Sequence, residues 1–184
     1  MAKKNTTPQF TVEEVKEKHQ LHRFLVLPEQ IYQNNNAWVE PLLQQQEHFF
    51  DPINPFWEHT DKILYILKNQ HGDTVGRIAG FIDHKHIAYT KKKTGFFGFF
   101  ECINNKTAAK QLIIQIKAWL KKKRMTNMLG PINATIGHEC GVLVDGFTKS
   151  PMPSMAFSPK YYLPLLQQAG LKKAKDLYAY DIHL

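Results

Sequence analysis

Two short groups of residues carry side chains that could bind a metal ion or act as nucleophiles. The first is Asp83-His84-Lys85-His86, with two imidazoles two residues apart, and the second is His138-Glu139-Cys140. A zinc site would need both groups to converge, and neither has the spacing of a known zinc motif such as H-E-x-x-H. We therefore predict no metal site. Cys140 beside His138 stays open as a nucleophile, although residues two apart on an extended chain need not touch.

Positive charge is the second chemical feature of the chain. Its 184 residues include 24 Lys and Arg against 16 Asp and Glu, a formal net charge of +8. Two clusters, Lys91-Lys92-Lys93 and Lys121-Lys122-Lys123-Arg124, hold seven of these cations. This balance favours an anionic partner, which could be nucleic acid, a membrane or a phosphorylated cofactor. Nucleic acid stays open as a partner, although no nucleic-acid-binding motif is present.

The composition indicates one ordinary globular domain and excludes several classes of protein. Hydrophobic residues make up 43% of the chain and charged residues 22%, which excludes a disordered chain. Two cysteines are too few for a secreted disulfide framework, and the polar N-terminus is no signal peptide. No window reaches the roughly 18 consecutive apolar residues of a membrane span. We expect a single cytoplasmic domain over residues 1–184, flexible over 1–10, without a membrane partner; its oligomeric state cannot be read.

The elements that must position these residues begin with helical patterns. Thr11 has the residue type of a helix N-cap, which predicts one or two short helices as far as Tyr32, interrupted at Pro28. The polar run 44–47 predicts a further helix. Apolar residues at helical spacing predict a long helix from Lys106 to about Arg124, capped by Asn104 or Asn105.

Strand patterns occupy the middle of the chain and recur at its end. Two apolar runs, 63–67 and 75–82, flank a turn signal and predict an antiparallel hairpin. A third strand is predicted over 95–100 and a fourth, parallel to it, over 127–132. A short helix over 159–168 ending at Gly170, and a strand over 175–182, complete the pattern. The sequence predicts an α/β (α+β) fold whose mixed, largely antiparallel central sheet is flanked by helices.

This order of elements resembles the GNAT-type acyltransferase superfamily. Several local motifs narrow the resemblance to a bacterial, mostly uncharacterised GNAT-like group: Trp38-Val39-Glu40-Pro41-Leu42, Asn54-Pro55-Phe56-Trp57-Glu58-His59, Val75-Gly76-Arg77-Ile78-Ala79, Gly95-Phe96-Phe97-Gly98-Phe99-Phe100-Glu101, Leu129-Gly130-Pro131-Ile132-Asn133, Glu139-Cys140-Gly141 and Lys175-Asp176-Leu177-Tyr178-Ala179-Tyr180. Members are often longer, with a further region, so the resemblance implies a truncated or split version of them.

The resemblance implies acetyl-CoA or another acyl-CoA as cofactor, bound along the third strand and the loop that enters the long helix. The implied contacts are Phe99, Phe100, Cys102, Ile103, Asn104, Asn105, Lys106 and Thr107. A helix N-terminus suits a diphosphate because its N–H groups lack partners within the helix. The glycine-rich signature of the family is absent between Gly98 and Gly130, so Lys106 and Lys110 would have to supply charge instead.

The resemblance also implies Glu101 as the general base, with apolar neighbours raising its pKa toward working pH. A strand-end glutamate in water or in an ion pair is the alternative. The position of the family's usual acid, four residues before Gly170, holds Leu166. Tyr161 and Tyr162 are predicted to be a buried anchoring pair, with a displaced general acid as the alternative. The implied function is acyl-CoA-dependent N-acyl transfer to an unknown amine. A non-catalytic interaction module and a nucleic-acid-binding protein stay open.

Overall fold

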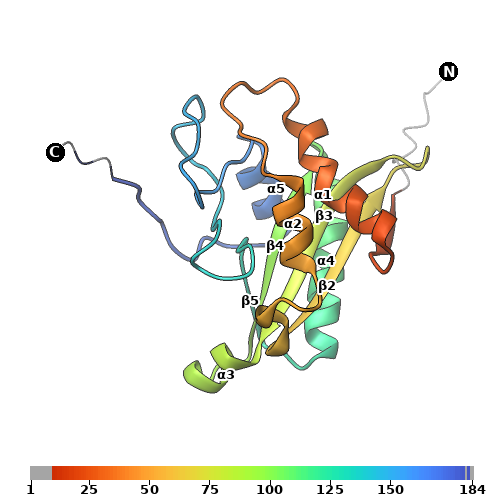
Figure 1. Ribbon diagram of the computed structural model, residues 1–184, viewed down its shortest axis with the longest axis vertical. Helices are drawn as coiled ribbons and strands as arrows, with labels where there is room; N and C mark the ends of the chain where they lie inside the picture. The colour runs from red at the N-terminus through yellow and green to blue at the C-terminus, as the bar shows by residue number, and fades with distance from the viewer. Residues whose placement is uncertain (1–9, 181, 183–184) are drawn as a thin grey trace.

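A single five-stranded sheet with helices on both faces forms the body of the computed structural model, which describes residues 10–180 and 182 (Figure 1). The strands lie side by side in chain order, β1-β2-β3-β4-β5. Neighbouring strands are antiparallel except β4 and β5, which run parallel. This architecture confirms the predicted α/β (α+β) class with a mixed, largely antiparallel sheet.

The strands at the centre of the sheet confirm the sequence patterns. β2 (Thr60–Lys68) and β3 (Thr74–Asp83) form the predicted hairpin, and β4 (Thr94–Cys102) is the predicted third strand. β5 (Asn127–Leu129) lies parallel to β4 but is shorter than predicted. It ends before Pro131, which has no N–H group to continue the ladder.

The N-terminal region differs from the predicted short helices. Thr11 begins strand β1 (Thr11–Glu14) rather than capping a helix, because the segment pairs with the edge of β2. Helix α1 (Lys18–Tyr32) continues through Pro28. Its inner face is fully buried, and this packing outweighs the hydrogen bond that the proline removes. The predicted helix near residues 44–47 is confirmed as α2 (Leu43–Phe50), and the short helix η1 (Pro55–Glu58) follows.

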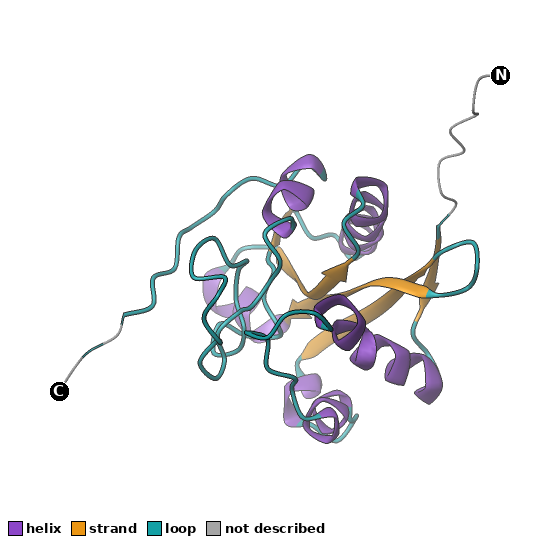
Figure 2. Ribbon diagram, turned by 90° about the horizontal axis from the view of Figure 1, so that it is seen from above, coloured by secondary structure: helices purple, strands orange, loops and turns teal. Residues whose placement is uncertain are grey.

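Helices lie on both faces of the sheet (Figure 2), and each face carries its own hydrophobic core. Helix α4 (Lys106–Lys122) and α5 (Tyr162–Gln168) cover one face, where Ile78, Leu112 and Ile116 are buried. Helices α1 and α2 cover the other face, over Phe24 and Phe81. Helix α3 (His84–Thr90) follows β3 at the lower end of the sheet in Figure 1. Alternate residues of β3 therefore serve different cores, as the pleat requires.

The C-terminal segment contradicts the strand that was predicted there. Residues 175–180 form no strand, although a strand was predicted over 175–182, because no described strand lies beside them to complete a ladder. Side chains of Leu177, Tyr178 and Tyr180 are exposed there. Residue 181 lies outside the described residues, and so do residues 1–9, on which the predicted flexibility of 1–10 falls.

Candidate active site

A β-bulge in β4 decides which way Glu101 points. Ala79 of β3 lies opposite Gly98, whereas Arg77 lies opposite Glu101, so β4 contains one extra residue between these pairs. Phe99 takes a left-handed backbone conformation at this point, with φ of 49°. One extra residue moves every following side chain to the other face of the sheet. Glu101 therefore lies on the α1 side, directly across from Arg77.

Three side chains form a buried polar network around the Glu101 carboxylate. Oε2 accepts hydrogen bonds from the Tyr32 hydroxyl at 3.0 Å and the Tyr162 hydroxyl at 2.5 Å. Arg77 Nη2 lies 3.7 Å from Oε1, and Arg77 Nη1 donates to the Phe24 carbonyl at 2.8 Å. No group among the described residues donates a hydrogen bond to Oε1. The carboxylate is thus held by one oxygen and has acceptor capacity left on the other.

The environment shifts the ionisation of these groups in opposing ways. Burial raises the pKa of the Glu101 carboxyl, while Arg77 and the two hydroxyls act to lower it. Burial also raises the pKa of Tyr32 and of Tyr162, so both stay protonated and remain donors. A carboxylate with a raised pKa can exchange a proton nearer to neutral pH than an exposed one can.

Glu101 lines a small pocket that is open to solvent. A second carboxylate, Glu139, lines the same pocket and accepts a hydrogen bond from Asn133 Nδ2 at 2.6 Å. The remaining lining is largely apolar or neutral: Phe99, Phe100, Pro131, Asn133, Gly141, Ala156, Phe157, Ser158 and Tyr162. No Lys or Arg side chain lines it. The lining itself is therefore acidic, and the buried Arg77 beside Glu101 offsets part of that negative charge.

The edge of β4 beside this pocket separates from β5 and is covered by tyrosines. The two strands pair over only three residue pairs, and two further contacts follow, Ile132 N–H to the Phe97 carbonyl and Phe99 N–H to Asn133 Oδ1. Beyond them, Cys102 N–H donates to the Tyr162 hydroxyl at 2.9 Å, and the Tyr161 hydroxyl donates to the Cys102 carbonyl at 3.1 Å. The polar backbone of Cys102 is thus already satisfied within the chain.

Two N–H groups in the first turn of α4 are satisfied in the same way. Asn105 is its N-cap, and Oδ1 accepts hydrogen bonds from the N–H groups of Thr107 at 2.9 Å and Ala108 at 3.1 Å. These are the amides that a diphosphate at a helix N-terminus would need. Together with the covered Cys102 backbone, this arrangement does not fit a cofactor diphosphate and arm held by backbone groups of this segment.

The structure brings some of the residues expected from sequence to one site and leaves others outside it. Glu101, Phe99 and Phe100 line the pocket. Cys102 is buried beneath the tyrosines, while Ile103, Asn104 and Lys106 are exposed at the start of α4. Neither Asn105 nor Thr107 lines the pocket.

Sequence reasoning missed four members of the site: Tyr32, Arg77, Glu139 as a pocket residue, and the polar role of Tyr162. Leu166, at the family's usual acid position, is buried in the core. Arg77 carried a signal, since it interrupts the apolar run of β3. Tyr32 lies 69 residues before Glu101 and Tyr162 lies 61 residues after it, so no local pattern could join them.

The other groups considered from sequence do not form a site. Among residues 10–180 and 182, no group of three or more His, Cys, Asp or Glu side chains could hold a metal ion. His138 Nδ1 lies 2.8 Å from the Thr135 hydroxyl, and the Cys140 thiol donates to the Thr135 carbonyl. Burial also raises the pKa of Cys140, so nothing in this arrangement activates it as a nucleophile. No helix in the described part of the chain is long and apolar enough to cross a bilayer.

Comparison with curated proteins identifies two bacterial relatives. A protein named bacterial ceramide synthase, from Caulobacter vibrioides, is 32% identical over 178 residues, which are 96% of this chain and 46% of the relative. Protein YghO of Escherichia coli is 29% identical over 163 residues, 89% of this chain and 42% of the relative. The chain thus spans about half the length of the curated relatives it matches. No family model matches it.

Solved structures with the same arrangement of elements are acetyltransferases. Glucosamine-6-phosphate N-acetyltransferase from Arabidopsis thaliana superposes with a TM-score of 0.54 at 9% identity, over 95% of this chain and 99% of that one. An aminoglycoside 6'-N-acetyltransferase from Acinetobacter baumannii gives 0.56 at 11% identity, over 96% and 99%. At these identities the likeness concerns the fold alone. The chain therefore has the fold of the GNAT-type acyltransferase superfamily, as its sequence motifs indicated.

Proposed function

We propose that this chain belongs to an N-acyltransferase whose acceptor is an amine with a long apolar chain, and that Glu101 takes the proton from that amine. The observation that carries the proposal is the pocket's composition. Two carboxylates, Glu101 and Glu139, lie in a pocket with aromatic walls and no lysine or arginine. An ammonium group is attracted to such carboxylates, and an apolar chain is stabilised against the aromatic side chains.

The chemistry assigned to Glu101 follows from its hydrogen bonds. Oε2 is occupied by the Tyr32 and Tyr162 hydroxyls, so Oε1 is the oxygen that would accept the proton. Removing that proton would free the lone pair of the amine nitrogen for attack on the acyl thioester carbonyl, so that the C–N bond forms as the C–S bond breaks. Of the two protons that the ammonium nitrogen loses, one would go to the leaving thiolate and the other would pass from Glu101 to solvent. A positioned general base of this kind contributes about 10² to 10⁴ in rate.

Different comparisons support the proposed acceptor and the proposed acyl donor. A ceramide is the amide of a fatty acid and a long-chain amino alcohol, so the name of the Caulobacter relative supports a lipid amine as acceptor. The acetyltransferase fold supports acyl-CoA as the donor, which would supply the activated acyl group. Because the N–H groups of Thr107 and Ala108 in α4 are hydrogen-bonded to Asn105, groups elsewhere would have to hold the diphosphate of the acyl-CoA.

The proposal is tested by incubating the chain with acyl-CoA and sphinganine and measuring the amide by mass spectrometry. We expect product from the unmodified chain and at least about a hundredfold less from Glu101→Gln. Glu58→Gln, which alters an exposed carboxylate outside the pocket, is the matched control and should retain full activity. Equal rates in both variants would remove Glu101 from the mechanism.

A second candidate function is a non-catalytic module that binds lipid amines. The satisfied backbone of Cys102 and of the α4 first turn favours it, since these groups are not free for a cofactor. This candidate predicts that sphinganine raises the melting temperature of the chain while acyl-CoA neither raises it nor yields an amide. Product formation would exclude it.

A further inference from the structure

We propose that a basic surface at the start of β4 docks the protein on an anionic phospholipid membrane. The surface consists of two turns, with the side chains Lys91, Lys92, Lys93, Lys121, Lys122, Lys123 and Arg124, all of them exposed. The fold brings the turns together, because the N–H groups of Thr126 and Asn127 both donate to the Lys93 carbonyl, at 2.9 and 3.1 Å. Two clusters separated by 27 residues of sequence thus become one surface.

This basic surface has almost no compensating negative charge. Residues 84–93 and 121–127 contain no Asp or Glu. Within the described residues, the one carboxylate that pairs with any of the seven cations is Asp61, which lies 3.0 Å from Lys123 Nζ and also contacts His84. Six cations therefore keep their charge available for a partner, and a cluster of this size is typical of surfaces that bind anionic lipids.

The backbone of both turns supplies a second observation. Lys91 ends α3 with φ of 57°, and Arg124 follows the end of α4 with φ of 63°. Helices usually end with glycine in this left-handed conformation, because a side chain there is disfavoured. The chain instead has basic residues at both positions, although their charge satisfies no carboxylate. We infer that a basic residue stands at each of these two positions because of its positive charge, since glycine would form the turn more easily.

The features of the basic surface favour a membrane over nucleic acid. Residues 84–93 and 121–127 contain a single aromatic residue of the Phe, Tyr or Trp type, which is Tyr89, and it is 90% exposed. A single tyrosine among lysines suits the headgroup region of a bilayer, whereas single-stranded nucleic acid is bound by several stacked aromatic side chains. The expectation of no membrane partner rested on the lack of an apolar segment long enough to span a bilayer. Docking on the membrane surface needs no such segment, so that observation does not argue against the proposal.

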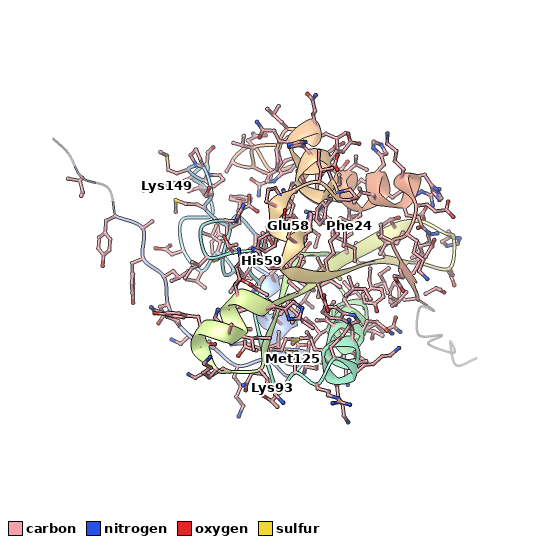
Figure 3. All side chains as sticks on the ribbon, turned by 60° about the horizontal axis from the view of Figure 1, so that its bottom comes forward. Phe24, Glu58, His59, Lys93, Met125 and Lys149 are labelled. Carbon is pink, nitrogen blue, oxygen red and sulfur yellow. The ribbon has the colours of Figure 1, made fainter. Side chains whose placement is uncertain are left out.

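The basic surface is separate from the candidate active site. Lys93 precedes the first residue of β4 and Glu101 lies near the last, about 25 Å away for an extended strand of this length. Figure 3 shows Lys93 and Met125 close together toward the lower edge of the molecule. Membrane docking can therefore be tested without altering the pocket, and its outcome does not depend on acyl transfer.

The experiment is co-sedimentation of the full chain with vesicles of phosphatidylcholine alone or mixed with phosphatidylglycerol. We expect binding only to the mixed vesicles, and its loss at high salt. The variant Lys92→Gln/Lys121→Gln/Lys122→Gln should bind about a hundredfold more weakly, since each charge contributes about fivefold. A variant with the same charge change elsewhere, Lys18→Gln/Arg23→Gln/Lys172→Gln, should bind like the unmodified chain.

Three results would overturn the proposal. One is equal binding to both kinds of vesicle, and another is equal loss in both triple variants, which would indicate net charge rather than this surface. The third is salt-dependent binding of a single-stranded oligonucleotide without vesicle binding, which would assign the surface to nucleic acid. Melting temperatures of both variants, expected to match the unmodified chain, exclude unfolding as the cause of weaker binding.

Discussion

Glu101 in the pocket and Asn105 at the start of α4 are four residues apart in sequence, yet the polar groups around them differ in whether they can still bind a ligand. At Glu101, one carboxylate oxygen accepts two hydroxyls and the other is free of hydrogen-bond donors among the described residues. At the α4 turn, Asn105 already occupies the amides of Thr107 and Ala108. The first region can accept a ligand, and the second would first have to break its own hydrogen bonds.

This difference shows why a fold alone does not assign a cofactor. The GNAT fold places a strand edge and a helix N-terminus together, but whether they bind an anion depends on the groups that already occupy them. Leaving a buried donor without a partner costs about 1–3 kcal/mol, so a ligand must replace each bond that it displaces. Four predictions test the contrast between the two regions.

The largest effect is expected from Arg77→Leu, which removes the buried cation beside Glu101. An uncompensated buried carboxylate should lower the free energy of unfolding by about 3–5 kcal/mol. Side chains of Arg77 and Glu101 are only 6% and 13% exposed, so solvent cannot replace the pair. Urea denaturation measures the change. The double variant Arg77→Leu/Glu101→Leu should recover most of the loss; no recovery would mean that Arg77 acts through packing alone.

A smaller effect is expected from Tyr162→Phe. Its hydroxyl donates to Glu101 and accepts from Cys102 N–H, so its removal leaves a buried N–H group without a partner. We expect a loss of about 1–3 kcal/mol in the free energy of unfolding. Tyr161→Phe loses one bond to the Cys102 carbonyl from a less buried position and should cost less. The reverse order would contradict the central place of Tyr162 in the network.

Asn105→Ala should lower stability by about 1 kcal/mol, the usual cost of losing an N-cap side chain. It also frees the amides of Thr107 and Ala108. If Asn105 excludes the diphosphate, coenzyme A should raise the melting temperature of this variant more than that of the unmodified chain. Asn104→Ala, which alters the exposed neighbouring side chain, should leave both quantities unchanged. Identical coenzyme A shifts in all three proteins would show that Asn105 does not control anion binding.

The pH dependence of acyl transfer tests the ionisation of Glu101. Burial raises its pKa above the ordinary value of 4.5, so the base form is lost as pH falls through this raised pKa. The acidic limb of kcat/KM should therefore lie above pH 4.5. Tyr32→Phe removes a hydroxyl that acts to lower the pKa, so its limb should move to higher pH. Tyr178→Phe, at an exposed position, should not move it.

Local patterns in the sequence determined most of the fold. Apolar runs located β2, β3 and β4, helical spacing located α4, and residue type narrowed its N-cap to Asn104 or Asn105, of which the structure has Asn105. These signals succeed because each element buries its own periodic face. They failed at Thr11 and at residues 175–180, where the presence or absence of a neighbouring strand decides the structure.

The tertiary structure alone decided the site. The family resemblance pointed to Glu101, but the bulge at Phe99 turned its side chain toward Arg77, and distant tyrosines completed its hydrogen bonds. Net charge also said nothing of where the charges lie, because the fold places seven of the 24 cations on one basic surface while two carboxylates and no Lys or Arg line the pocket. Composition counts charges, whereas the electrostatic environment of a group depends on which charges lie within a few ångströms of it.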